Sequence, residues 1–237
     1  MSEIHISKET LTRIISDLKQ IKRNPLEENG IYYIHDESNI MVGYALIIPK
    51  NETAYQYGNY LFSIEFPPNY PYAPPKVLFM TNNGTTRFHP NLYRNGKVCL
   101  SLLNTWKGDQ WTSCNTLTSV LMNMLTLFDE NPFLNEPGIT EDHTELPLYN
   151  TIIEYQNFNT AIYDMLFNRD FKRKLKPIEP LFKKIIKEQY NENKSKIMDK
   201  LEKISLKNNR ILTIHMPFYR MEEEINYPKL IEKLKES

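Results

Sequence analysis

Residues 31–80 read IYYIHDESNIMVGYALIIPKNETAYQYGNYLFSIEFPPNYPYAPPKVLFM, and their pattern fixes the fold class. The stretch contains four short runs rich in β-branched and aromatic residues, at 31–35, 39–48, 59–66 and 76–80. Asn, Gly and Pro residues separate the runs, as turn residues separate neighbouring strands. Parallel strands need longer crossover connections than those available between these runs. The stretch therefore predicts an antiparallel meander of four strands.

Helices are predicted on both sides of this meander in the sequence. Apolar residues recur at helical spacing first at Leu11, Ile14, Ile15, Leu18 and Ile21, and later at Leu117, Val120, Leu121, Met124, Leu125 and Phe128. The first series stops before Asn24-Pro25, as a helix terminus should. Because a sheet with one apolar face must bury it, we expect the second helix to pack against the sheet. The fold class that follows is α+β.

The segment after the meander, HPNLYRNGKVCLSLL at residues 89–103, places Cys99 eight residues after Asn91. Asn95-Gly96 between them readily adopts the positive φ angles of a tight turn, so we expect Cys99 to fold back toward Asn91. A thiol is a good acyl carrier, and a carboxamide N–H stabilises an oxyanion, which together favour acyl transfer. The alternative is that Cys99 is a small buried hydrophobic residue. The spacing alone does not decide between them.

Composition narrows the function class without identifying it. The chain has 237 residues, 41% of them hydrophobic, with 29 basic and 29 acidic side chains. A balanced charge does not favour nucleic-acid binding. The two cysteines, Cys99 and Cys114, form no CxxC or Cys/His cluster, so neither a disulfide framework nor a metal site is indicated. The sequence shows no leader pattern and no apolar run of membrane-spanning length, and we expect a cytoplasmic or nuclear protein without membrane association.

Three motifs in order resemble the ubiquitin-conjugating enzyme family: FPPNYPYAPPKV at 66–77, the segment 89–103, and WTSCNTLTSVLMNMLTLF at 111–128. The resemblance covers about residues 11–138. Within the family the chain is most similar to the catalytic domain of the large hybrid enzymes that combine conjugating and ligase functions, since GKVCLSLLNTW (96–106) and NPFLNEPG (131–138) are in register with them. The fold that this resemblance implies has an N-terminal helix, the four-stranded meander, a central helix and C-terminal helices.

The resemblance implies a transferase that accepts ubiquitin as a thioester on Cys99 and passes it to substrate lysines. The implied partners are ubiquitin, an activating enzyme, protein substrates and a ubiquitin ligase. No cofactor is implied, because ATP is used by the activating enzyme. His89 and Pro90 are expected to hold the turn that supports the site. For Asn91 the sequence leaves open whether its amide binds the oxyanion or backbone groups.

Partner-binding residues are also implied by the resemblance. They are Arg13 in the first helix, Pro71 and Tyr72 in a proline-stiffened loop, and Trp111 and Ser113 in a second loop. Many relatives carry proline where this chain has Ser113, so the usual ligase contact is altered.

The acid that relatives place near the incoming lysine has no direct counterpart, since Leu134 occupies the matching position. Glu136 is our candidate for this acid, with Asp129 and Glu130 as neighbouring alternatives. Trp106 lies in a longer loop after Cys99, where it either shields the thioester or packs on the surface.

The domain division that we predict is a conjugating domain at 1–170 and a mostly helical, basic extension at 171–237. Residues 172–207 carry twelve basic and five acidic side chains, with apolar residues at helical spacing. A short strand within 209–219 and a last helix near 227–234 are expected to follow. We expect the extension to help position ubiquitin or substrate after the thioester forms.

Two alternatives to this function remain. The first is a non-catalytic ubiquitin-binding scaffold of the same fold, which the presence of Cys99 in its motif disfavours. The second is a conjugating enzyme for another ubiquitin-like modifier.

Overall fold

The computed structural model describes residues 6–175, 178–208 and 210–236. The first helix, α1 (Lys8–Arg23), begins after Ser7, whose side chain accepts a hydrogen bond from the Thr10 N–H, and it ends at Asn24. A Ser side chain in this position satisfies a backbone donor that the helix leaves free. The predicted first helix is confirmed, and it starts one turn earlier than the apolar repeat.

The predicted meander is confirmed. After the short 3-10 helix η1 (Glu27–Asn29), the strands are β1 (Ile31–His35), β2 (Val42–Ile47), β3 (Tyr60–Glu65) and β4 (Lys76–Phe79). They form one antiparallel sheet in the order β1-β2-β3-β4. The central helix α2 (Leu117–Leu125) starts at Thr116, whose side chain and Ser119 cap each other reciprocally.

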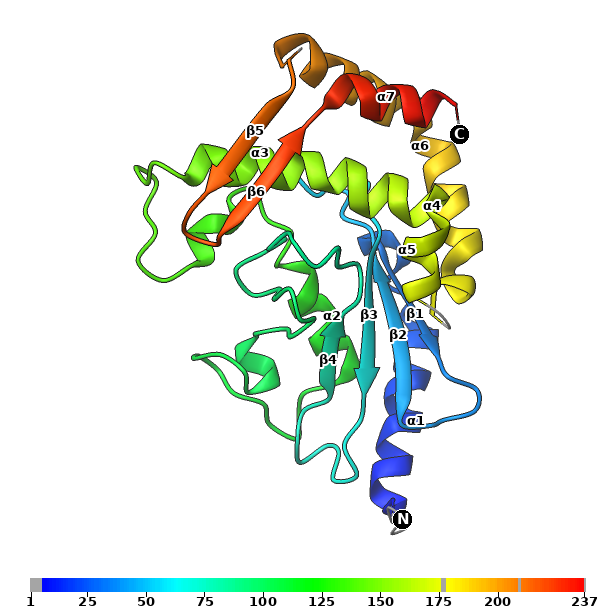
Figure 1. Cartoon of the computed structure of the whole chain (residues 1–237). Coiled ribbons are helices and arrows are strands. Elements are labelled where there is room, and N and C mark those ends of the chain that lie inside the picture. Colours follow the sequence, from blue (N-terminus) through cyan, green and yellow to red (C-terminus); the bar gives the residue numbers. More distant parts are fainter. Residues whose placement is uncertain (1–5, 176–177, 209, 237) are drawn as a thin grey trace.

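Helices and a β-hairpin follow the meander (Figure 1). In chain order they are η2 (Ser101–Leu103), α2, η3 (Pro132–Asn135), α3 (Leu146–Gln156), the π-helical segment η4 (Asn157–Asp164), α4 (Met165–Phe167), α5 (Arg169–Lys174), α6 (Ile178–Lys207), β5 (Leu212–Met216), β6 (Met221–Ile225) and α7 (Tyr227–Lys235). The stretch from α3 through α4 crosses the end of the sheet, and the hairpin of β5 and β6 lies over α3. The α+β class and the family's arrangement of elements are confirmed.

Both faces of the four-stranded sheet are buried. Along β2, Ala45 and Ile47 belong to one hydrophobic cluster, whereas Tyr44 and Leu46 belong to another. The first cluster also contains buried side chains of α1 and α2. The second contains Phe182, Ile186, Ile197 and Leu201 of α6. The period-two alternation of a strand therefore sends apolar side chains into two separate cores.

The extension has the predicted amphipathic helix, strand and last helix, together with the further strand β6. Its apolar side chains join both clusters. Met216 and Met221 belong to the cluster of α1 and α2, and Tyr227, Leu230 and Leu234 belong to the cluster of α6. Both hydrophobic clusters contain residues from before and after residue 170. The division of the chain into two domains at this residue stays a prediction.

Candidate active site

The turn between Asn91 and Cys99 includes Asn95 and Gly96, as predicted. Gly96 has φ +86°, and a Cβ at this position would lie 3.0 Å from the Phe79 carbonyl oxygen. The Gly96 N–H donates to the Tyr93 carbonyl at 2.9 Å, and the Tyr93 N–H donates to the Lys97 carbonyl at 2.9 Å. Glycine suits this position because, without a Cβ, it reaches the positive φ without strain. The chain reverses at this turn and returns toward Asn91.

The reversal places Asn91 beside Cys99. The Cys99 N–H donates to the Asn91 carbonyl at 2.9 Å, and the Asn91 side-chain amide donates to the Cys99 carbonyl at 2.6 Å. Both polar backbone groups of Cys99 are therefore bonded to the same residue. Cys99 is 2% exposed and Cys114 is exposed, and both are free thiols. The roles of Cys99 and Asn91 in the reaction stay predictions.

Thr105 fixes the backbone on either side of Cys99. Its hydroxyl oxygen accepts from the Leu100 N–H at 2.9 Å and lies 3.0 Å from the Val98 carbonyl oxygen, to which its O–H donates. The backbone around Cys99 is thus held between Asn91 and Thr105. Thr105 was not predicted as a site residue. A threonine between the apolar pair Leu102-Leu103 and Trp106, next to Asn104, was the available signal.

His89 supports the turn from inside. Its Nδ1 accepts a hydrogen bond from the Asn91 N–H at 2.9 Å. Burial, and then the charge of Arg87, lower the pKa of His89 to about 3. The imidazole is therefore neutral at pH 7, with Nδ1 occupied as an acceptor. The supporting role of His89 in the reaction stays a prediction.

Arg87 is a second residue that was not predicted at the site. Its guanidinium donates to the His89 carbonyl at 3.2 Å and to the Pro90 carbonyl, which ties down both residues before Asn91. Its bonds go to backbone carbonyls, which residue types alone do not reveal.

The predicted partner-binding residues lie on two neighbouring loops and on α1. The Trp111 indole N–H donates to the Pro71 carbonyl at 2.7 Å, and Arg13 donates to the Ser113 carbonyl at 2.7 Å. Trp111 is buried by this arrangement, whereas Tyr72 is 65% exposed and donates through its hydroxyl to Glu9 at 2.6 Å. The interactions join the loops and α1 into one surface with Tyr72 exposed on it.

Two of the candidate acids, Glu136 and Asp129, accept hydrogen bonds from different parts of the molecule. Glu136 accepts a hydrogen bond from the Tyr219 hydroxyl, at the tip of the β5–β6 hairpin. Asp129 accepts from the Asn135 amide at 2.8 Å, and burial raises the pKa of its carboxyl group. Leu134 is half-buried.

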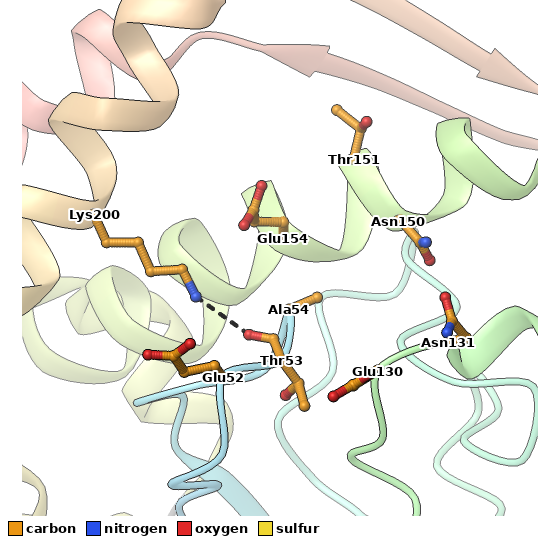
Figure 2. Close-up of a pocket in the computed structure, with 9 residues that line it drawn as sticks. All are labelled: Glu52, Thr53, Ala54, Glu130, Asn131, Asn150, Thr151, Glu154 and Lys200. Atoms are coloured by element: carbon orange, nitrogen blue, oxygen red, sulfur yellow. Dashed lines mark hydrogen bonds between the residues drawn. The ribbon is translucent and has the colours of Figure 1, made fainter.

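Glu130 faces a different part of the molecule. It lines a pocket of about 450 Å³ together with Glu154 of α3 and Lys200 of α6 (Figure 2). The Lys200 ammonium donates to the Thr53 carbonyl at 3.3 Å across this pocket. Cys99, Asn91 and Glu136 are not among the residues that line it.

A second pocket connects the loop after Cys99 with the loop that carries Glu136. It has a volume of about 720 Å³ and is lined by Thr105, Trp106 and Pro137, with Asn104, Lys107 and Gln110. Trp106 is 37% exposed on its wall. Pro137 lines this pocket opposite the loop after Cys99, and Glu136 directly precedes Pro137 in the sequence. Among the three candidate acids, only Glu136 is adjacent in sequence to a residue that lines this pocket.

Among the residues that the structure describes, no three His, Cys, Asp or Glu side chains are grouped so that they could hold a metal ion. Within the same residues, no helix has the length and apolar character needed to span a membrane.

Comparisons with known proteins identify the family. The family model described as ubiquitin-conjugating enzyme matches residues 13–156, more than half of the chain. Ubiquitin-conjugating enzyme E2 Z of Xenopus tropicalis is 39% identical over 163 residues, which are 68% of this chain and 51% of that protein. The human E2 Z is 39% identical over 159 residues, 66% of this chain and 44% of that protein. The chain thus spans about half the length of these curated relatives.

Similarity to a hybrid enzyme, as expected from the sequence motifs, is also found. The human dual E2 ubiquitin-conjugating enzyme/E3 ubiquitin-protein ligase BIRC6 is 37% identical over 121 residues, 48% of this chain and 2% of that protein. The similarity to E2 Z extends over a longer stretch.

Proposed function

The chain belongs to the ubiquitin-conjugating enzyme family, and on this premise we propose that Cys99 accepts ubiquitin as a thioester from an activating enzyme and that the chain transfers it to substrate lysines. The observation that carries the proposal is the position of Cys99 within the matched region, with its own backbone bonded to Asn91 and with the backbone of the neighbouring Val98 and Leu100 bonded to Thr105. A backbone fixed in this way keeps the sulfur in one place through both acyl transfers. The scaffold alternative is not favoured.

The chemistry proposed for Cys99 has two steps. In the first, the Cys99 thiolate attacks the acyl group carried by the activating enzyme, a new C–S bond forms, and the donor thiolate leaves. In the second, a neutral lysine amine attacks the thioester carbonyl, an oxyanion forms, the C–S bond breaks, and the amine proton passes to a base. Because Cys99 is 2% exposed, the side chains that cover it must move before the first step.

The partners and setting of this reaction are also part of the proposal. The chain itself needs no cofactor, since the activating enzyme consumes ATP. Ubiquitin, the activating enzyme, a ligase and protein substrates are its partners. We place its action in the cytoplasm, the nucleus or both. Neither nucleic acid nor a membrane is among its proposed partners.

A charging assay tests the proposal. The protein is incubated with an activating enzyme, ATP and either ubiquitin or another ubiquitin-like modifier, and the products are separated with and without a thiol reductant. We expect an adduct with ubiquitin that the reductant removes. An adduct formed with another modifier and not with ubiquitin would assign the chain to that modifier, and the absence of any reductant-sensitive adduct would favour a scaffold.

Asn91→Ala is expected to slow the discharge of ubiquitin to lysine by about 100-fold, the usual effect of losing one oxyanion donor. It also removes the hydrogen bond to the Cys99 carbonyl, which should lower the free energy of unfolding by about 1 kcal/mol. Charging and discharge rates, measured separately, check the prediction. Asn191→Ala, at an exposed position of α6 away from the site, is the control. Equal losses of charging, discharge and stability would leave Asn91 with a structural role alone.

Tyr72→Ala is expected to weaken charging or ligase stimulation about tenfold or more, because an exposed rigid aromatic side chain suits the centre of a transient interface. The fold should survive, since the ring is largely in solvent. Tyr72→Phe is the matched control, because it removes the bond to Glu9 and keeps the ring. Unchanged charging kinetics and unchanged ligase stimulation in the alanine variant would exclude the docking role.

Glu136→Gln is expected to slow discharge to free lysine by about 100-fold if this carboxylate takes the amine proton, with little effect on charging. The glutamine oxygen still accepts from Tyr219, so the local structure should be kept. Glu130→Gln is a matched control, because it makes the same chemical change in the pocket of Figure 2. Normal discharge by the Glu136 variant would remove this residue from the mechanism.

A further inference from the structure

A small pocket lies between the segment 87–95, which leads into the turn before Cys99, and the tip of the β5–β6 hairpin. It has a volume of about 240 Å³ and is lined by Arg87, Tyr93, Arg94, Asn95 and Tyr219. The first four come from the segment that surrounds the site, and Tyr219 comes from the extension. Two of the five side chains are arginines, and none is acidic.

Arg87 is held in this pocket by uncharged groups. Its guanidinium carbon lies 3.3 Å from the centre of the Tyr93 ring and 5.3 Å from that of the Tyr219 ring. Its hydrogen bonds go to the carbonyls of His89 and Pro90. Stacking and carbonyl bonds fix the orientation of a guanidinium but leave its full charge uncompensated.

Arg94 is also held by backbone carbonyls, and one of its N–H groups has no acceptor among the described residues. One Nη donates to the Tyr219 carbonyl at 2.6 Å. Its Nε is buried and has no hydrogen-bond partner among the residues that the structure describes. Burial, and then the charge of Arg87, lower the pKa of Arg94. A buried donor without a partner is costly, so it calls for an acceptor.

The positive charge in this region is not balanced by carboxylates. Within the described residues, neither Arg87 nor Arg94 forms an ion pair. A third cation, Lys97, has its Nζ 5.7 Å from the centre of the Tyr93 ring. The carboxylate of Glu136 binds the Tyr219 hydroxyl and does not line the pocket.

We propose that this pocket binds a phosphate-class dianion, either free phosphate or a phosphate monoester on a protein side chain. Two guanidinium groups match a charge of about −2, and their planar N–H groups suit phosphate oxygens. The guanidinium groups of Arg87 and Arg94, which both line the pocket, supply the donors for the phosphate oxygens. The dianion fastens the hairpin tip, which holds Glu136 through Tyr219, to the turn that brings Cys99 back to Asn91.

The test uses the full chain and inorganic phosphate as the probe, at constant ionic strength. The arginine Nε–H resonances are followed by ¹H–¹⁵N NMR during the titration. We expect a saturable shift of the Arg94 Nε–H that chloride does not produce. Arg94→Gln should weaken phosphate binding about tenfold or more, as for the loss of a charge-assisted hydrogen bond. Arg220→Gln, which removes a neighbouring charge outside the pocket, should leave the affinity within about twofold.

The source of the phosphate is distinguished with two peptides of one sequence, with phosphoserine or with serine. Tighter Arg94-dependent binding of the phosphopeptide than of inorganic phosphate identifies a protein-borne group, and equal binding identifies the free ion. If Arg94→Gln fails to fold, Arg94→Lys keeps the charge, loses the Nε–H and should still bind phosphate more weakly than the unchanged chain. No saturable shift with either probe, or equal loss of affinity in the Arg94 and Arg220 variants, would overturn the proposal.

Discussion

Cys99→Ser is expected to abolish the ubiquitin adduct that a thiol reductant releases. The serine hydroxyl forms an oxyester in place of a thioester, and an oxyester is a poorer acyl donor to lysine. We therefore expect any adduct of this variant to resist the reductant and to transfer ubiquitin too slowly to detect. Reducing and non-reducing gels of the charging reaction measure both effects.

Cys114→Ser is the matched control for this experiment. It makes the same atomic change at the other cysteine of the chain, which is exposed and lies in the loop after Trp111. Charging should stay intact in this variant. If Cys114 and not Cys99 were required for the adduct, the assignment of the site would be wrong, since an exposed thiol would then be the acceptor.

Removal of residues 171–237 is expected to unfold the protein, with charging and transfer lost together. A milder outcome, with transfer reduced more than charging, would follow from the sequence-based expectation that the extension helps to position ubiquitin or substrate after the thioester forms. The difference follows from the buried outer face of the sheet, where Tyr44 and Leu46 share a cluster with Phe182 and Leu201. Exposing one such side chain costs about 1.5–3 kcal/mol. A few of them account for the whole stability of a typical domain, about 5–15 kcal/mol.

Thermal unfolding of the truncated and full chains measures this effect. A point-variant pair gives a gentler version of the same test in α6. Leu201→Ala, at a position that is 0% exposed, should lower the free energy of unfolding by about 2–5 kcal/mol. Leu206→Ala, at a position that is 82% exposed, should leave it nearly unchanged. If the truncated chain unfolded at the same temperature as the full chain, the extension would be an appendage that does not stabilise the rest of the protein.

The meander and the helices α1 and α2 could be predicted because their signal is local. Strand runs, turn residues and helical repeats lie within single short segments. The covering of the outer face was not predicted, although the sequence carried a sign of it. The run GYALII at 43–48 is apolar at consecutive positions, which indicates a strand that is buried on both faces.

The candidate site could be predicted only in part for a similar reason. Cys99 lies only eight positions after Asn91, and the segment between them has a recognisable turn, so their contact follows from local chemistry. Thr105 and Arg87 act on backbone carbonyls and amides, which leave no pattern in residue types. The bond between Tyr219 and Glu136 spans 83 residues and depends on how the hairpin packs on α3.

Peptide mapping of the charged protein by mass spectrometry, at an acidic pH that preserves thioesters, locates the acceptor atom for ubiquitin without relying on any variant. We expect the C-terminal residues of ubiquitin on the peptide that contains Cys99, and we expect a thiol reductant to release them. Ubiquitin attached at Cys114, or through a lysine amide with Cys99 unmodified, would contradict the assignment of Cys99 as the acceptor.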